Sequence, residues 1–334
     1  MEPVGVGIVG AGVGRRHAQG LMDDPRVCRT VLCDVEEDRL ERYVAEMGVK
    51  ETATDWQALI ERDDLHVISV ATPDHLHPEM SIAALRAGKH VLCEKPMAPT
   101  LVEAREMVRA VEETGKKLMV NNVLRFYPRF QRVKQLVDDG TLGHIYAAEG
   151  DYLHNTVELI RHGWRGPHRH SVMTGGGVHL IDLLLWIVGD VAEVFCYSSR
   201  GALTPEESHS PDCMLAVLRF ENGCVAKAMT NMSVQRPALH NFILYGTRGT
   251  FINGKPDGVL YRGHQGEPEP VKEAYGATDA GRGRKAVGIT HLLDCIERDE
   301  EPLVDVREGA RAIAVCDAIY ESCRTGRPVR VKAV

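Results

Sequence analysis

The sequence lacks an excess of positive charge. Its 40 lysines and arginines are outnumbered by 47 aspartates and glutamates, which leaves a net charge of −7. Nucleic acids and anionic membranes attract proteins through clustered basic residues. We therefore expect neither of them as a partner.

Closely spaced cysteines are missing too. The nine cysteines are scattered, mostly within apolar runs, and no two of them form a Cys-x-x-Cys pair. Disulfide frameworks and cysteine-based zinc sites show characteristic cysteine spacings that this chain does not have. The pattern predicts reduced thiols in the protein core.

Long apolar segments are also absent. The longest candidate, residues 178–188, is interrupted by His179 and Asp182, whereas a membrane-spanning helix needs about 18 or more apolar residues. The first residues, MEPVGVGIVGAG, have neither the charged start nor the cleavage site of a signal peptide. We expect a cytoplasmic protein.

The 334 residues exceed what one hydrophobic core usually serves, so we expect two domains. Up to residue 122, short apolar runs alternate with amphipathic segments, which is typical of a parallel sheet with helices on both faces. The predicted strands are residues 4–9, 27–33, 67–71, 90–93 and 117–121, and the predicted helices are residues 15–22, 36–47, 55–61, 78–87 and 100–113. The pattern predicts an α/β protein whose residues 1–122 form a doubly wound Rossmann domain.

Residues 123–334 are expected to form an α+β domain. After a helix at residues 128–139, polar and apolar residues alternate with a period near two, and glycine-containing turns separate the runs. These strands are residues 145–154, 191–200, 213–221, 224–233, 239–245 and 258–261, followed by helices at 288–298 and 307–325 and a strand at 328–331. We expect a large, mostly antiparallel open sheet, with a C-terminal tail that can pack back on the first domain.

A glycine-rich turn follows the first predicted strand. In Gly10-Ala11-Gly12-Val13-Gly14 the first glycine permits a tight turn, the second lets the backbone approach a pyrophosphate, and the next helix offers its positive N-terminus. Asp34 ends the next strand, where a carboxylate binds ribose hydroxyls and repels a 2′-phosphate. We expect NAD rather than NADP, although a glycine turn without a ligand is the alternative reading. Arg15 can either reach a phosphate or face solvent.

Two further segments follow strands whose carboxyl ends should face the ligand crevice. Thr72 and Pro73 end one strand, and His75 and His77 come just after them. We expect this segment near the nicotinamide, with helix capping as the alternative role of the histidines.

The second of these segments is Glu94-Lys95-Pro96. Lys95 can hydrogen-bond a substrate hydroxyl, and burial can lower its pKa enough for proton transfer. A surface lysine in a turn is the plainer alternative.

Together these motifs resemble the Gfo/Idh/MocA oxidoreductases, which are named for glucose-fructose oxidoreductase and inositol dehydrogenase. Glu94-Lys95-Pro96 is the most diagnostic element, and Arg125-Phe126-Tyr127-Pro128, Gly175-Gly176-Gly177 and His179-x-x-Asp182 agree with it. The resemblance covers essentially the whole chain. It implies a Rossmann domain joined to an open sheet that binds the substrate and often mediates oligomerisation, so we expect a homodimer or homotetramer.

The resemblance also implies roles for individual residues. Lys95 would position or relay the proton of the reacting hydroxyl, and His179 would bind or deprotonate that hydroxyl. The cofactor contacts would include Glu94, Lys95, Asn122 and Arg125. Many members of the family carry an aspartate four residues before the histidine, where this chain has Gly175. Asp182 lies one helical turn after His179 and is expected among the substrate contacts, where it can orient the imidazole, or it can be a structural helix residue.

The polar stretch 161–170 has little helix or strand character and is interpreted as a substrate loop. The substrate contacts expected from it are Trp164, Arg165, His168 and His170, joined by Tyr152 and His154 at the end of the preceding strand. A surface or inter-subunit loop is the alternative. No clear carboxylate accompanies these histidines, so we expect no metal.

The expected function is hydride transfer between nicotinamide and a secondary alcohol of a sugar, sugar derivative or inositol. Two alternatives stay open. One is glycoside cleavage through transient oxidation and elimination, with no net redox change. The other is a non-catalytic sensor of NAD or sugar.

Overall fold

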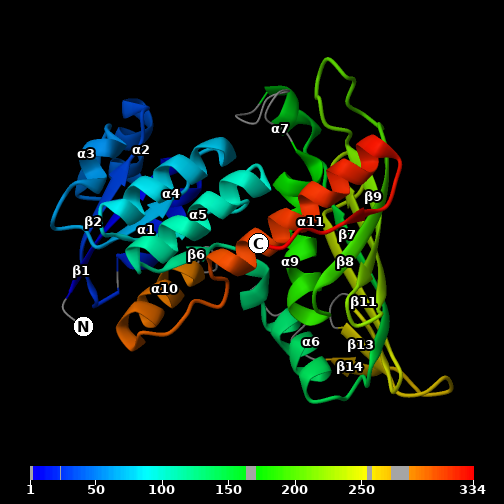
Figure 1. Ribbon diagram of the computed structural model, residues 1–334. Coiled ribbons are helices and arrows are strands. Elements are labelled where there is room, and N and C mark those ends of the chain that lie inside the picture. Colours follow the sequence, from blue (N-terminus) through cyan, green and yellow to red (C-terminus); the bar gives the residue numbers. More distant parts are fainter. Residues whose placement is uncertain (1–2, 23, 163–170, 254–257, 272–285) are drawn as a thin grey trace. The chain divides into compact units, whose positions relative to one another are not determined.

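The computed structural model describes residues 3–22, 24–162, 171–253, 258–271 and 286–334, and the chain divides into two units (Figure 1). The first unit comprises residues 1–123 and 281–310, with Val334. The second comprises residues 124–280 and 311–333.

The first unit is built on a parallel sheet of six strands. Its strands are β1 (Val4–Val9), β2 (Val27–Cys33), β3 (Glu51–Ala53), β4 (Val67–Val70), β5 (His90–Cys93) and β6 (Leu118–Val120). Their order is β3-β2-β1-β4-β5-β6, so the direction of winding reverses between β1 and β4. In such doubly wound sheets, ligands bind at the carboxyl ends of the strands beside this reversal.

Helices pack around the strands of the first unit. They are α1 (Ala11–Leu21), α2 (Glu37–Met47), α3 (Trp56–Ile60), α4 (His77–Arg86), α5 (Leu101–Thr114) and α10 (Val287–Arg298), with a 3₁₀ turn η1 (Asp74–Leu76). Helix α4 packs beside α5, and α1 packs beside α10. Helix α5 shows how sequence fixes an element: Thr100 and Glu103 form a reciprocal capping box at its start, and Gly115 ends it with a left-handed backbone.

The second unit contains a nine-stranded sheet. Its strands are β7 (Ile145–Leu153), β8 (Val191–Ser199), β9 (Cys213–Phe220), β10 (Val225–Asn231), β11 (Leu239–Gly246), β12 (Thr250–Ile252), β13 (Gly258–Tyr261), β14 (Glu269–Val271) and β15 (Val329–Arg330). The order is β14-β13-β12-β11-β7-β10-β9-β8-β15. Only β7 and β10 pair in parallel among these described strands; the other pairs are antiparallel.

Strict alternation along β9 explains why one face of this sheet is buried. Met214, Ala216 and Leu218 are inaccessible to solvent, whereas Leu215 and Val217 between them are exposed. Such a period of two places successive side chains on opposite faces. One face therefore packs against helices, and the other stays open.

Helices cover the buried face of the second unit (Figure 1). They are α6 (Pro128–Asp138), α7 (Val157–His162), α9 (Val178–Ile187) and the part of α11 (Val306–Thr325) that belongs to this unit, with a 3₁₀ turn η2 (Val123–Phe126) and a π-helical turn η3 (Met173–Gly177). Helix α9 packs against β7 and α6. Gly150 permits this packing, because a side chain there would collide with Leu180.

The predicted fold class is confirmed in both halves, with differences in short elements. Strand β3 was not expected, since its three residues are polar or small and only partly buried. Strands β12 and β14 are equally short. Arg161 and His162, expected in an irregular loop, instead form the last turn of α7.

The expected absence of disulfides agrees with the structure. All nine cysteines are free, and burial raises the pKa of the Cys33 and Cys196 thiols to about 12. Cys28 is exposed. Across the described ranges, no helix has the length and apolar character that a bilayer crossing requires.

Candidate active site

The glycine turn has the geometry of a phosphate-binding turn. Gly10 has a φ of 96°, and a side chain there would strike the Ala71 carbonyl. A side chain on Gly12 would meet nothing within 4 Å, so the backbone is open to an approaching molecule. Gly14 lets α1 pack closely on β1, because a Cβ there would lie 2.6 Å from Ile8 Cγ2. The short glycine spacing therefore keeps the three roles of a dinucleotide turn.

Asp34 is held rigidly at the end of β2. Its Oδ2 accepts a hydrogen bond of 2.8 Å from the Ala11 amide, and its Oδ1 accepts one of 3.1 Å from the Glu36 amide. Arg39 also reaches it, with Nη1 3.1 Å from Oδ2 and 3.3 Å from Oδ1. The carboxylate is therefore oriented beside the head of α1, with a cation that the sequence analysis did not anticipate. Arg15 donates a 2.8 Å hydrogen bond to the Tyr43 hydroxyl.

His77 joins the two motifs that follow β4 and β5. It is 1% exposed, with Nε2 2.9 Å from the Thr72 carbonyl oxygen and Nδ1 2.7 Å from the Pro96 carbonyl oxygen. Its ring therefore binds protein backbone, and it makes no side-chain cap at the start of α4. His75 is exposed on η1, and Pro73 directly precedes this turn.

A buried network fixes Glu94, which directly precedes Lys95. Glu94 Oε1 accepts a 2.6 Å hydrogen bond from Asn121 Nδ2 and lies 3.2 Å from His17 Nε2. The other His17 ring nitrogen, Nδ1, lies 2.8 Å from Ser69 Oγ. Glu94 Oε2 accepts a 3.2 Å bond from the Lys95 amide.

The network keeps Glu94 ionised. Burial would raise the pKa of this carboxyl, but hydrogen bonds from His17 and Asn121, together with the Lys95 ammonium, lower it to about 2. Glu94 is thus an anion at neutral pH. Sequence reasoning missed the Glu94 partners His17 and Asn121, and Ser69, which contacts His17.

Asn122 follows β6 and is 1% exposed. Among the described residues, neither Oδ1 nor Nδ2 of its amide has a hydrogen-bond partner. An unpaired buried polar group costs about 1–3 kcal/mol. The amide therefore fits a ligand at the carboxyl edge of this sheet, which is where the cofactor contact was predicted.

In the second unit, Arg125 and Asp182 form a buried ion pair. Arg125 Nε lies 3.0 and 3.1 Å from the two carboxylate oxygens, and Nη2 lies 2.8 Å from Oδ1. Both side chains are 1% exposed, and the guanidinium lies 5.6 Å from the centroid of the Trp186 ring. The geometry ties Asp182 to Arg125, two residues that the sequence analysis had assigned to different ligands.

An aromatic cluster surrounds Tyr152 on the buried face of the sheet. Its ring stacks 4.2 Å from His154, 4.9 Å from His240 and 5.9 Å from His179. His154 Nε2 and His240 Nε2 are 2.9 Å apart, so one imidazole donates and the other accepts. His240 was not predicted, although it lies two residues before the buried Phe242 and therefore on the same face of β11.

The glycine triplet brings η3 against this cluster. A Cβ on Gly176 would lie 3.0 Å from the Tyr152 ring, and one on Gly177 would lie 2.5 Å from Met173 Sδ. A larger residue at Gly176 would push the π-helical turn away from Tyr152 on β7, and one at Gly177 would collide with Thr230 on β10. Gly176 and Gly177, which follow the position where the resemblance implies an aspartate, are therefore closely packed.

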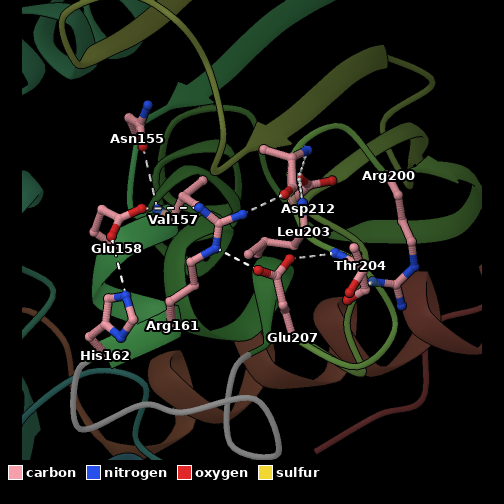
Figure 2. Close-up of polar contacts among 11 residues, drawn as sticks. Asn155, Val157, Glu158, Arg161, His162, Arg200, Leu203, Thr204, Glu207 and Asp212 are labelled. Carbon is pink, nitrogen blue, oxygen red and sulfur yellow. Dashed lines mark hydrogen bonds and ion pairs between the residues drawn. The ribbon is translucent and has the colours of Figure 1, made fainter.

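Helix α7 is anchored to the loop between β8 and β9 (Figure 2). Arg161 donates a 2.7 Å bond to Glu207 and a 3.1 Å bond to the Ala202 carbonyl. Asp212 orders this loop by accepting hydrogen bonds from three successive amides, Gly201 to Leu203. Arg161 therefore has a structural role, because it holds α7 against this loop.

The remaining predicted substrate contacts, Trp164, Arg165, His168 and His170, lie outside the described residues. Among the residues that are described, no group of histidines, cysteines and carboxylates is arranged to hold a metal ion.

Comparisons with known proteins agree with this architecture. The curated relatives include 1,5-anhydro-D-fructose reductase of Ensifer adhaerens, 30% identical over 87% of each chain. They also include myo-inositol 2-dehydrogenase of Thermotoga maritima, 25% identical over 98% of this chain and 99% of the relative. A solved structure of levoglucosan dehydrogenase with NADH superposes with a TM-score of 0.89 at 22% identity and covers all of both chains.

Family models match both halves of the chain. Residues 4–122 match the oxidoreductase family with an NAD-binding Rossmann fold, and residues 134–331 match its C-terminal α/β domain. The expected NAD cofactor is confirmed at this level. The chain therefore belongs to the Gfo/Idh/MocA family of NAD-binding oxidoreductases.

Proposed function

We propose that this protein transfers a hydride between NAD and a secondary alcohol of a sugar, sugar derivative or inositol, with Lys95 and His179 handling the alcohol proton. The observation that carries the proposal is the buried network that fixes Glu94 as an anion directly beside Lys95. The names of the relatives, which include a sugar reductase and an inositol dehydrogenase, support the substrate class.

The first unit supplies residues that fit the cofactor. Gly12 leaves the backbone at the head of α1 open, Asp34 presents an oriented carboxylate, and Asn122 carries an unpaired buried amide. The nicotinamide ring, when bound, accepts or returns the hydride. The residues of this chain orient the two reactants and move the proton.

Lys95 suits proton handling because of its chemical setting. The neighbouring Glu94 carboxylate stays ionised, so it cannot supply a proton at neutral pH and instead favours the ammonium form of the lysine. An ammonium can donate to the oxygen that becomes a carbonyl or alkoxide. Lys95 is therefore the proposed hydrogen-bond donor to the reacting oxygen.

The second unit is proposed to recognise the substrate. Tyr152, His154 and His179 form one cluster with His240. The histidine rings and the tyrosine hydroxyl can both donate and accept hydrogen bonds. Hydroxyl groups on a sugar ring need such mixed partners. His179 is the member assigned to the reacting hydroxyl, while the other three are assigned to binding.

The test is a screen for NADH formation over inositols, hexoses, uronic acids and glycosides, read beside mass spectrometry of the products. We expect stoichiometric NADH and a ketone product from at least one cyclic polyol. Consumption of a glycoside with a released aglycone and no NADH would instead favour the redox-neutral reaction. Tight NAD binding with no turnover of any substrate would favour a sensor.

Cofactor preference should depend on Asp34. We expect an Asp34→Asn variant to bind NADH about tenfold or more weakly, because a charge-assisted acceptor for the ribose hydroxyls is lost. Its preference should shift toward NADP, since the carboxylate no longer repels a 2′-phosphate and Arg39 is released to bind one. Fluorescence titration with both reduced dinucleotides measures this shift.

The matched control for that experiment is Asp38→Asn. Asp38 is an exposed carboxylate on the same helix as Arg39. Its variant should keep the parent affinity for both dinucleotides. Equal losses in the two variants would count against a specific role of Asp34.

The open face of the second sheet is proposed to form a homo-oligomer. Tyr197 pairs with Leu215 across β8 and β9, Val217 lies two residues further on, and the exposed fractions are 70%, 41% and 54%. Exposed apolar side chains gathered on one sheet face are typical of interfaces. A second copy of the same face is the expected partner.

A Val217→Asp variant should be monomeric at concentrations where the parent protein is a dimer or tetramer, because burying an unpaired carboxylate in an interface is strongly unfavourable. Light scattering after size exclusion measures the mass. The control is Val102→Asp, an exposed valine of α5 in the first unit, which should leave the mass unchanged. A parent protein that is already monomeric would refute the proposed interface.

A further inference from the structure

Only one protonation state of His77 satisfies its hydrogen-bond geometry. Both ring nitrogens face backbone carbonyl oxygens, Thr72 at 2.9 Å and Pro96 at 2.7 Å. A carbonyl oxygen can only accept, whereas a neutral imidazole has one N–H and one lone pair. A neutral ring would therefore point a lone pair at an oxygen lone pair inside the protein.

We infer that His77 is an imidazolium whose two N–H groups tie the Thr72 and Pro96 carbonyls together, and that this clamp positions Lys95 for the reaction. The inference rests on the proposed role of Lys95. It assigns His77 as a positioning residue that acts through the backbone, whereas the sequence analysis had placed it among the cofactor contacts.

The clamp acts on the residue next to Lys95. On the amino side, the Lys95 amide donates to Glu94, which the His17 and Asn121 network holds. On the carboxyl side, Pro96 is held by His77. Buried polar groups thus fix the backbone on both sides of Lys95. They therefore restrict the position of the Lys95 Cα atom, from which the side chain extends.

The surroundings of His77 support a cation. The groups that face it are Asp74 on η1, Cys93 on β5 and the Pro96 carbonyl. Burial by itself would lower the pKa of this histidine, but these three groups raise it to about 9. The direction of this shift agrees with the hydrogen-bond geometry, which requires an N–H on both ring nitrogens.

The protonation state can be tested without any activity. In protein labelled with ¹⁵N-histidine, both His77 nitrogens should carry hydrogen at pH 7.5, and the signal is assigned by its loss in a His77→Gln variant. A lone-pair nitrogen in this ring at pH 7.5 would overturn the inference. This result is independent of whether the proposed reaction is correct.

The positioning role is tested with substrate and NAD once turnover by the parent enzyme is established. An amide at position 77 cannot donate to two carbonyls on opposite sides, so His77→Gln should lower kcat by about 10- to 100-fold while leaving NADH affinity within about threefold. His77→Lys retains a charged group with several donors and should recover a large part of kcat. The control His66→Gln changes an exposed histidine that accepts a hydrogen bond from the Gly5 amide.

The outcomes separate clearly. A drop in kcat for His77→Gln with rescue by His77→Lys supports the clamp. A kcat equal to that of His66→Gln refutes it, as does an equal loss in the Gln and Lys variants. Should His77→Gln fail to fold, His77→Lys supplies the assignment of the His77 signal, and the protonation state measured in the parent protein decides whether the ring is a cation.

Discussion

A Lys95→Met variant should lose about 10²- to 10⁴-fold in kcat, the usual contribution of a positioned acid or base. Methionine fills a similar volume but cannot donate a hydrogen bond, so the alcohol oxygen loses its partner. NADH affinity should stay within about threefold, because the proposed cofactor contacts of Gly12, Asp34 and Asn122 remain. Steady-state kinetics and fluorescence titration measure the two effects separately.

Lys50→Met serves as the comparison, since Lys50 is an exposed lysine before β3. It should behave as the parent enzyme does in both measurements. A Lys95→Met variant with parental kcat would remove Lys95 from the chemistry. The same outcome would also remove the basis for the assigned role of His77 as its positioning residue, although not the charge of that histidine.

Removing one member of the buried Arg125–Asp182 pair should be strongly destabilising. Asp182→Ala leaves the guanidinium buried without its carboxylate, which costs about 3–5 kcal/mol. That loss is a large part of the roughly 5–15 kcal/mol that usually separates folded from unfolded domains. Chemical denaturation followed by circular dichroism should show an earlier transition for this variant.

Two further variants identify the cause of that loss. Asp190→Asn breaks an ion pair with Arg311. The Asp190 carboxylate is 65% exposed, so this change should cost at most about 1 kcal/mol. Replacing both partners, as in Arg125→Met with Asp182→Leu, should recover part of the stability because no charge is left buried alone. An equal loss in the single and double variants would mean that packing, and not the uncompensated charge, dominates.

Much of the fold could be predicted because the buried face of a strand or helix determines the spacing of apolar residues in the sequence. The six residues of β1 are all buried and form a continuous run with no charged or polar side chain, and β9 alternates strictly. Strand β3 was not predicted, because its composition does not indicate a strand. It is extended because it pairs with β2. Arg161 looked irregular because its polar side chain binds a loop more than 40 residues away in the sequence.

The candidate site was predictable where a local motif carries the chemistry. Gly10, Gly12 and Asp34 sit at fixed positions relative to strands, and Glu94-Lys95-Pro96 follows one. Residues that only the chain topology brings together show no local sequence motif. His17 and Glu94 are separated by 77 residues, and His154 and His240 by 86. Only the order of strands in each sheet makes these pairs neighbours.

Arg39 illustrates a third kind of omission. It lies five residues after Asp34, close enough in sequence to be considered, but a charged residue in the first turns of a helix usually faces solvent. Its contact with both oxygens of Asp34 depends on where α2 begins relative to β2. Helix starts are the element boundaries that sequence patterns locate least well.

The distribution of the thiols offers a practical route to observing this protein at work. Six of the nine cysteines are buried, and Cys28 at the start of β2 is exposed. Maleimide dyes react with accessible thiolates, so brief labelling of the native protein should favour Cys28 over the buried sulfurs. A fluorophore attached there would sit at the opposite end of β2 from Asp34 and would report on dinucleotide binding without occupying the proposed cofactor contacts.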